Sequence, residues 1–164
     1  MIVNIVILAL VTLERLIELR IAGANTKRLM GTGGYEMGPG HYPLIVALRA
    51  SWLAALWWLA PFQPVSLPLL ALFGLVELGR LWVLLTLGRR WTTRIIVVPG
   101  EALVRRGPYR FINHPNYIVV VAELALLPLV FGLWRTAVVF SLLNAALLTI
   151  RVREENRALD DQSG

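Results

Sequence analysis

The chain contains no cysteine and only two histidines, His41 and His114, among its 164 residues. Without thiols it forms no disulfide, no thiolate-bound metal site and no cysteine nucleophile. Two histidines are too few for a multi-histidine metal centre, so we expect no bound metal. The chain also lacks the strand–Gly-x-Gly-x-x-Gly–helix unit that holds dinucleotides in soluble enzymes.

Charged residues are scarce as well, since they make up 16% of the chain against about 25% in an ordinary soluble domain. The mean hydropathy is +0.68. Several apolar runs approach the roughly 17–25 residues that a helix needs to cross a hydrocarbon core. These runs are Met1–Leu13, Leu44–Ala60, Ser66–Leu87, Tyr117–Trp134 and Thr136–Ile150. We predict an all-α integral membrane protein with about five transmembrane helices, of which the first and fifth extend past the membrane surface as amphipathic helices.

The first apolar run is compatible with a signal peptide or with an uncleaved helix. No positive residues precede it, and Glu14 and Arg15 occupy the place where a signal peptide has a small-residue cleavage site. We therefore favour an uncleaved first helix.

Basic residues gather on one side of the predicted membrane. They follow the first and fifth helices and fill the connection between the third and fourth, whereas the connection 61–65 has none and the turn near Trp134 has only Arg135. The positive-inside rule then places the N-terminus outside and the C-terminus in the cytoplasm. This bias also accounts for the pI of 10.7, so we expect no nucleic-acid partner.

Two segments on the cytoplasmic side interrupt the helices. Gly31–Pro43 reads GTGGYEMGPGHYP and lacks the Gly-Lys-Ser/Thr end of a phosphate-binding loop. We interpret it as a flexible connector; the alternative is a lid over a cytoplasm-facing site, with Glu36 or His41 as a polar contact. The run Trp91–Val98 is β-branched and too short to span, so it predicts an extended or interfacial segment with Trp91 as an aromatic anchor.

Ionisable residues inside the predicted spans are costly, so they indicate ion pairs or functional sites. Glu77 and Arg80 lie three residues apart on one helix face, which predicts a mutual ion pair. Arg49 lies close enough to the cytoplasmic end of its helix to extend its guanidinium to the surface. Glu123 follows Asn116 by seven residues, so it shares that helix face and is expected in the interior, beneath the start of the helix.

The segment Arg105–Tyr117, RRGPYRFINHPNY, opens the fourth helix. Pro115 suits the first helical position because its missing N–H would have no partner there. The remaining first-turn N–H groups and the positive end of the helix dipole form a binding site for an anionic group. We expect Asn113 and His114 just outside the helix, beside that group.

The fifth helix carries a polar stripe. At 100° per residue, Asn144, Arg151 and Glu155 fall within about 40° of one another, and Glu154 lies beside them. Periodicity alone favours a solvated amphipathic tail with an i,i+4 salt bridge; the alternative is one wall of a site. Because few residues join the fourth and fifth helices, we expect an antiparallel hairpin whose cytoplasmic ends meet at one mouth.

These two blocks resemble the isoprenylcysteine carboxyl methyltransferase and phospholipid methyltransferase superfamily of membrane enzymes. The resemblance covers roughly the C-terminal third of the chain, and its matching blocks are Gly107–Arg110, Asn113–Tyr117 and Arg151–Glu155 with Leu159. Asn113 replaces the Arg that is usual in the family, and Ile118 and Val119 stand where a small residue is common. The segments 91–100 and 36–43 are similar to small bacterial members, some of which methylate alkylpyrones or alkylresorcinols.

The resemblance implies S-adenosylmethionine as the cofactor, bound between the last two helices and the cytoplasmic tail. On that basis the cofactor-binding candidates are Tyr109, His114, Pro115, Asn116, Tyr117, Glu154 and Glu155. Arg151 is expected to hold the acceptor oxygen, with Glu123 as a second catalytic candidate. The substrate-binding candidates are Glu36, His41, Trp91 and Arg94. The acceptor is expected to be lipophilic and to enter from the bilayer.

The expected organisation is a single membrane domain over 1–164. Substrate-side helices occupy 1–87, a cytoplasmic connector 88–114, and the cofactor-binding hairpin and tail 115–164. The expected activity is O-methylation of an alkylpyrone or alkylresorcinol-type lipid in a bacterial cytoplasmic membrane. Prenylcysteine carboxyl methylation and phospholipid N-methylation are alternatives within the superfamily. A small transporter or non-catalytic subunit is the alternative outside it, and it predicts polar residues distributed through the spans and pseudo-symmetric halves.

Overall fold

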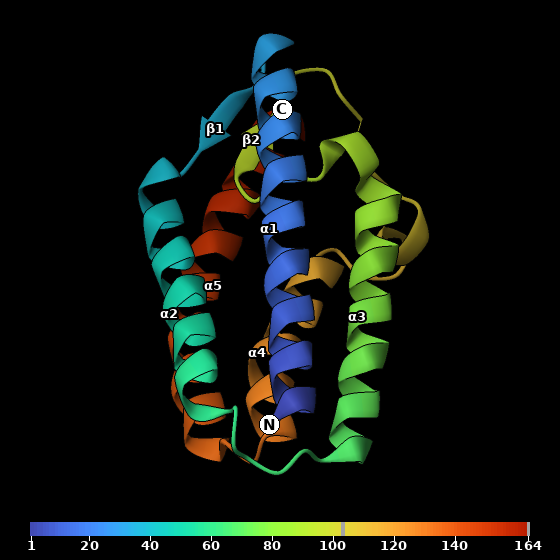
Figure 1. Ribbon diagram of the computed structural model, residues 1–164. Helices are drawn as coiled ribbons and strands as arrows, with labels where there is room; N and C mark the ends of the chain where they lie inside the picture. The colour runs from blue at the N-terminus through green and yellow to red at the C-terminus, as the bar shows by residue number, and fades with distance from the viewer. Residues whose placement is uncertain (103, 164) are drawn as a thin grey trace.

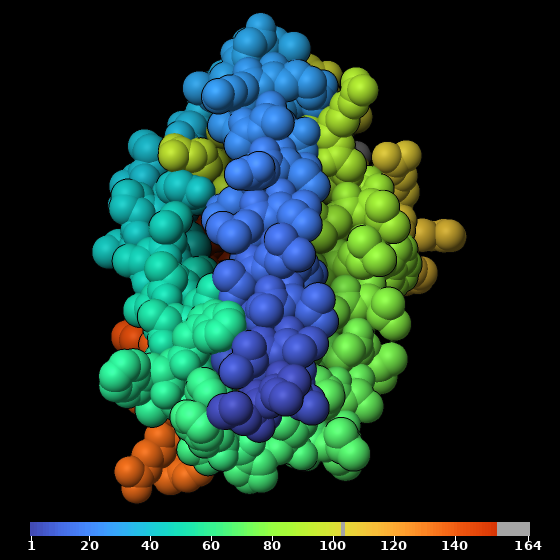
Figure 2. Space-filling view, viewed as in Figure 1, coloured from blue at the N-terminus to red at the C-terminus, as the bar shows by residue number. Residues whose placement is uncertain are grey.

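Five long helices run along a common direction in the computed structural model (Figure 1). The structure describes the backbone of residues 1–102 and 104–163, and the side chains of these residues as far as residue 153. The helices are α1 (Ile2–Gly31), α2 (Tyr42–Leu59), α3 (Leu67–Leu87), α4 (Pro115–Val130) and α5 (Trp134–Ser163). In Figure 2, α1 lies along the front of the bundle, between α2 and α3.

Each predicted apolar run lies mostly in one of these helices. The length and apolar composition of the helices identify the chain as a membrane protein. Within the described residues, three helical segments are long and apolar enough to cross a membrane: Pro39–Leu59, Leu67–Arg90 and Trp134–Arg153. α4 is apolar but has only 16 residues, and the first 18 residues of α1 include three charged ones, Glu14, Arg15 and Glu18. Five spanning helices therefore stay a prediction.

The apolar core lies around α4, and much of the outer surface is apolar too. Leu8, Leu56, Leu124, Leu127 and Phe131 are fully buried where α1, α2 and α4 meet. Outward-facing leucines are largely exposed on the other side of the same helices and on α3 and α5. An exposed apolar surface of this extent is typical of a protein whose solvent is lipid.

The α4–α5 hairpin forms as predicted, with residues 131–133 as its turn. Leu133 N–H donates to the Pro128 carbonyl at 2.9 Å, and Gly132 takes a φ of +69° that glycine adopts at little cost. The hairpin therefore places the start of α4 and the C-terminal part of α5 at the same end of the bundle. Figure 1 shows the chain's N-terminus at the opposite end.

Two short strands modify the all-α prediction. β1 (Tyr35–Met37) and β2 (Ile95–Val97) pair in an antiparallel ladder with Glu36 opposite Ile96. The extended segment predicted within Trp91–Val98 is thus confirmed as β2. The Gly-rich segment expected as a flexible connector instead contains β1 and the 3₁₀ turn η1 (Pro39–His41), because β2 offers it a pairing edge.

Candidate functional site

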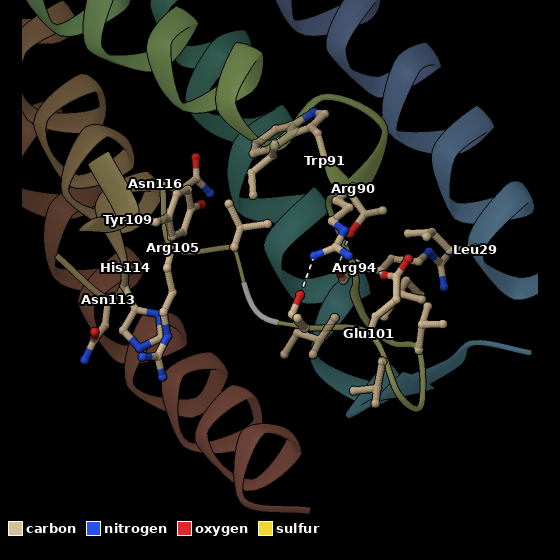
Figure 3. A pocket seen from close by; sticks show the side chains of 18 of the residues that line it. Leu29, Arg90, Trp91, Arg94, Glu101, Arg105, Tyr109, Asn113, His114 and Asn116 are labelled. Atoms are coloured by element: carbon tan, nitrogen blue, oxygen red, sulfur yellow. Dashed lines mark hydrogen bonds and ion pairs between the residues drawn. The ribbon is translucent and has the colours of Figure 1, made fainter. Parts of the chain in front are cut away.

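A polar cavity of about 790 Å³ lies at the end of the bundle where α4 begins. One wall comes from the 3₁₀ turn η2 (Gly88–Arg90) and the segment through β2, with Arg90 and Arg94 (Figure 3). The facing wall comes from the 3₁₀ turn η3 (Gly107–Arg110) and the start of α4, with Tyr109 and His114. α5 adds Arg151. The predicted helix-start site therefore opens into a cavity.

A second, smaller cavity of about 320 Å³ lies deeper in the bundle and is bounded mainly by apolar side chains. α1, α2 and α5 supply most of its lining, for example Leu16, Ile45 and Leu148. Figure 2 shows the surface hollowed between α1 and α2, with part of α5 visible behind the hollow. This apolar cavity is therefore lined by the helices that border the hollow.

The two cavities share a wall. Trp91, Thr92, Asn116, Tyr117 and Arg151 line both of them. A molecule in the polar cavity and a molecule in the apolar cavity would meet at these five side chains.

Gly107 allows η3 to lie against the C-terminal end of α3. Its φ is +56°, and a Cβ at this position would lie 2.4 Å from Thr86 Oγ1. Only glycine therefore fits at this close approach. η3 begins there and carries Tyr109 into the polar cavity.

The start of α4 agrees with the sequence prediction. The helix begins at Pro115, with His114 in the preceding cap position. The His114 and Tyr117 rings stack with centroids 5.2 Å apart and an interplanar angle of 22°. This stack holds His114 beside the start of α4, where the positive end of the helix dipole stabilises an anionic group.

Arg151 joins the α5 stripe to the opening of α4. Its Nε donates to Tyr117 Oη at 3.0 Å, and its Cζ lies 5.7 Å from the Tyr117 ring centroid. Asn144, two turns earlier on the same stripe, is buried and lines the apolar cavity. The two blocks predicted to meet at one mouth are therefore in contact. The side chains of Glu154 and Glu155 lie outside the described residues, although the α5 backbone continues through both.

Two polar atoms at the shared wall lack hydrogen-bond partners among the described residues. They are Asn116 Oδ1, an acceptor, and Trp91 Nε1, a donor. A buried polar atom without a partner costs free energy that a bound ligand can recover. Their position between the cavities makes both atoms candidate contacts for a ligand.

Trp91 is not the interfacial anchor that we predicted. Its side chain is 4% exposed and packs with Ala22 and Val83. Asn25 Nδ2 holds the Trp91 carbonyl at 2.8 Å, which draws the segment after η2 into the bundle. The burial of Asn25 on α1 has no simple signal in the sequence.

Other arginines supply the positive charge that is missing at Asn113. Asn113 lines the polar cavity together with Arg105 and Arg110. Arg106 instead donates to the Thr86 carbonyl at 3.2 Å. The polar cavity therefore keeps cations beside the start of α4 despite the substitution.

The predicted substrate-binding residues on the Gly-rich segment do not reach either cavity lining in the described part of the chain. Glu36 instead pairs with Arg94, whose Nη1 lies 2.8 Å from Glu36 Oε2. The Arg94 Cζ lies 4.2 Å from the Tyr42 ring centroid and Arg94 lines the polar cavity. Glu36 therefore orients Arg94 across the β1–β2 pair, and His41 ends the adjoining turn η1.

A cluster of buried and half-buried charges, here called the ion cluster, crosses the bundle between α1, α2, α3 and α4. It consists of Arg15, Glu18, Arg49, Glu77, Arg80 and Glu123. Arg80 is central, because its guanidinium binds both oxygens of Glu123 at 2.8 and 2.9 Å and also binds Glu18. The Arg80 Cζ lies 5.9 Å from the Trp91 ring centroid, so the cluster lies next to the shared wall.

The ion cluster overturns two predictions. Glu77 does not pair with Arg80 but lies 3.3 Å from Arg15, because Arg80 turns into the bundle towards α1 and α4. Arg49 does not extend to the membrane surface but points inward, with its Nη1 3.9 Å from Glu123 Oε2. Glu123 does face the interior, as predicted, yet it lines neither cavity among the described residues.

Sequence reasoning missed the contribution of α1 to this region. Arg15 and Glu18 both line the apolar cavity. Their signal was present, since an i,i+3 pair of opposite charges follows directly on the apolar run of α1.

Comparison with known proteins places the chain in a family. The model of the isoprenylcysteine carboxyl methyltransferase (ICMT) family matches residues 69–161, which include the start of α4, its hairpin and the α5 stripe. An uncharacterized protein of Bacillus subtilis (strain 168), YpbQ, is 34% identical over 170 residues, which cover 96% of this chain and 96% of YpbQ. An uncharacterized protein of Haemophilus influenzae (strain ATCC 51907 / DSM 11121 / KW20 / Rd) is 24% identical over 151 residues, covering 88% of each chain. No solved structure matches the chain.

The matched region spans more than half of the chain and contains both blocks that form the shared wall on α4 and α5. With its apolar helices, the chain is a membrane protein of the methyltransferase type, and it belongs to the isoprenylcysteine carboxyl methyltransferase family.

Proposed function

We propose that this protein uses S-adenosylmethionine to methylate an oxygen of a lipophilic acceptor of the alkylpyrone or alkylresorcinol kind. The observation that carries the proposal is the wall shared by a polar and an apolar cavity. Transfer from a polar donor to an apolar acceptor needs such a wall, because the reacting atoms must approach to about 3–3.5 Å. In this proposal all five helices span the bacterial cytoplasmic membrane, and the end with the polar cavity faces the cytoplasm.

The residues around the start of α4 fit the amino-acid end of the cofactor. Arg105 and Arg110 line the cavity beside the start of α4, and their charges together with the positive end of the helix dipole suit a carboxylate. Asn116 Oδ1 has no partner among the described residues, and it suits an ammonium donor. The polar cavity thus offers complementary groups for both charges.

The aromatic residues of the same wall suit the adenine. Tyr109 lines the cavity from η3, while Tyr117 and His114 present a stacked pair from α4. Aromatic faces of this kind bind a flat heterocycle by offset stacking. Glu154 and Glu155 remain our candidates for the ribose hydroxyls, since carboxylates are strong acceptors for them.

When bound, the cofactor supplies an electrophilic methyl group on a sulfonium. The displacement that follows depends on positioning and a dry site more than on acid catalysis. Arg151, fixed by Tyr117, holds the acceptor oxygen at the shared wall, and Trp91 closes that wall. Glu123 acts through Arg80 as a positioning residue.

The rest of the acceptor occupies the apolar cavity and reaches it from the bilayer through the hollow between α1 and α2. Arg94 remains a substrate-side candidate at the polar rim, held by Glu36, with His41 on the adjoining turn. Lateral entry keeps the tail out of water throughout.

Isothermal titration with S-adenosylhomocysteine tests the cofactor assignment. The wild-type chain should bind it, and His114→Ala and Glu155→Ala should weaken the binding. Arg135→Ala is the matched control, because Arg135 lies at the start of α5, at the far end of that helix from the polar cavity. Absence of binding by the wild-type protein would remove the basis of the proposal.

The acceptor is identified by incubating membranes that contain the protein with methyl-labelled S-adenosylmethionine and a lipid extract. Mass analysis should show the label on an oxygen of a long-chain alkylpyrone or alkylresorcinol. A labelled phospholipid amine would refute the acceptor class, and a water-soluble product would refute lateral entry.

A further inference from the structure

The ion cluster presents its arginines to the apolar cavity more than its carboxylates. All three of its arginines line the cavity, but of its carboxylates only Glu18 does so among the described residues. Arg151 adds a fourth guanidinium at the shared wall. A largely apolar cavity thus has a polar side that is rich in cations.

Arg49 is the least neutralised of the three cluster arginines. Arg80 binds two carboxylates closely, and Arg15 lies within 3.5 Å of four. Arg49 has a single carboxylate contact among the described residues, at 3.9 Å, and its buried Nε has no hydrogen-bond partner there. A half-buried guanidinium with so few acceptors attracts an anion.

Most of the buried polar atoms of this lining that lack a partner among the described residues are donors, and the exception is Asn116 Oδ1 at the shared wall. Besides Arg49 Nε, the buried Nε1 atoms of Trp52 and Trp91 have no partner among the described residues. All three side chains belong to the cavity lining. A ligand that complements these three donors supplies acceptor oxygens.

We propose that Arg49 is the anion-recognising residue of the apolar cavity, and that the ligand is a lipophilic acid with one apolar tail and an acidic oxygen at its head. The proposal rests on the proposed function, in which this acid is the methyl acceptor. A carboxylic acid and a phenol or enol share this chemistry, and a nearby cation favours the ionised oxygen of either. An ionised oxygen needs no general base, and a cationic amine would be repelled.

The test compares acids with neutral analogues of the same shape. Radiolabelled hexadecanoate and hexadecanol form one pair, and pentadecylphenol and its methyl ether form the other. Each is titrated onto the full chain in phosphatidylcholine nanodiscs, and binding to empty nanodiscs is subtracted. In at least one pair the acid should bind about 10- to 100-fold more tightly, the effect of a charge-assisted hydrogen bond. The pair that shows the preference identifies a carboxylate or a phenol as the acidic head.

Arg49→Met should abolish this preference, and Arg49→Lys should keep part of it because the cation remains. Arg153→Met is the matched control, since Arg153 is exposed and lines neither cavity among the described residues. The control should keep the full preference. If Arg49→Met fails to fold, the preference of the wild type for the acids and its partial loss in Arg49→Lys still test the proposal. Equal binding of acid and neutral analogue in both pairs, or a full preference in folded Arg49→Met, overturns the proposal.

Titration with S-adenosylhomocysteine separates this inference from the proposed function. A wild-type chain that prefers the acids but does not bind S-adenosylhomocysteine contradicts the methyltransferase proposal and leaves the anion site standing. A chain that binds S-adenosylhomocysteine without preferring either acid overturns the anion site alone.

Discussion

Replacing Arg80 by methionine removes the central cation of the ion cluster. Arg80 is 5% exposed and joins α3 to Glu18 on α1 and to Glu123 on α4, which are themselves buried. Without it these carboxylates lose their closest partner, and removing one member of a buried pair costs about 3–5 kcal/mol. We therefore expect Arg80→Met to lower the free energy of unfolding by about 3–5 kcal/mol.

Unfolding by sodium dodecyl sulfate in mixed micelles, followed by tryptophan fluorescence, measures this loss. The double variant Arg80→Met/Glu123→Gln should recover most of the stability, because Glu18 keeps Arg15 at 3.0 Å and Glu123 no longer carries a charge. Arg20→Met is the control, since Arg20 is exposed on α1, and it should leave stability unchanged. An Arg80→Met protein within about 1 kcal/mol of wild type would refute the view that these pairs hold the helices together.

Three further changes test separate parts of the molecule. Gly107→Ala should lower the free energy of unfolding by about 1–3 kcal/mol, because alanine is strained at a positive φ and its Cβ meets the Thr86 hydroxyl. Gly74→Ala is the control, because a Cβ there meets open space, and it should not lower the free energy of unfolding in the same mixed-micelle assay. Tyr117→Phe keeps the ring but removes the hydroxyl that accepts a hydrogen bond from Arg151. The affinity for S-adenosylhomocysteine should therefore fall by about tenfold while the melting temperature stays unchanged. An unchanged affinity in calorimetry would show that this contact plays no part in cofactor binding. Asn4→Leu removes two hydrogen bonds to the α2–α3 connection and should lower the free energy of unfolding by about 1–3 kcal/mol without changing the affinity for S-adenosylhomocysteine. A loss of S-adenosylhomocysteine binding would show that the far end of the bundle is coupled to the polar cavity.

The features predictable from the sequence are those that depend on local periodicity and turn chemistry. The length of the apolar runs indicated the helices, and the missing N–H of Pro115 located the start of α4 at the right residue. The β-branched run before Pro99 indicated β2. Its partner β1 was not predicted, because a three-residue strand in a Gly-rich segment has no periodic pattern of its own.

The partners of buried charges could not be predicted, because they depend on how each helix is rotated in the bundle. Spacing on α3 suggested that Glu77 and Arg80 pair with each other, yet each finds a partner on another helix. An exposed i,i+3 pair contributes only a few tenths of a kcal/mol, so a buried carboxylate on a neighbouring helix outweighs it easily. For the same reason Arg49 points to Glu123 and lines the cavity instead of extending to the membrane surface.

Bundle stability and ligand binding place opposite demands on the ion cluster. Pairing every arginine completely would give the most stable bundle, since an unpaired buried charge is costly. A completely neutralised cluster would leave the apolar cavity with nothing to orient a polar head. The structure lies between these limits, because Arg80 is fully paired while Arg49 keeps a distant carboxylate and a donor without a partner among the described residues. Incomplete pairing at Arg49 costs stability, and it provides the binding energy that an acidic acceptor would recover.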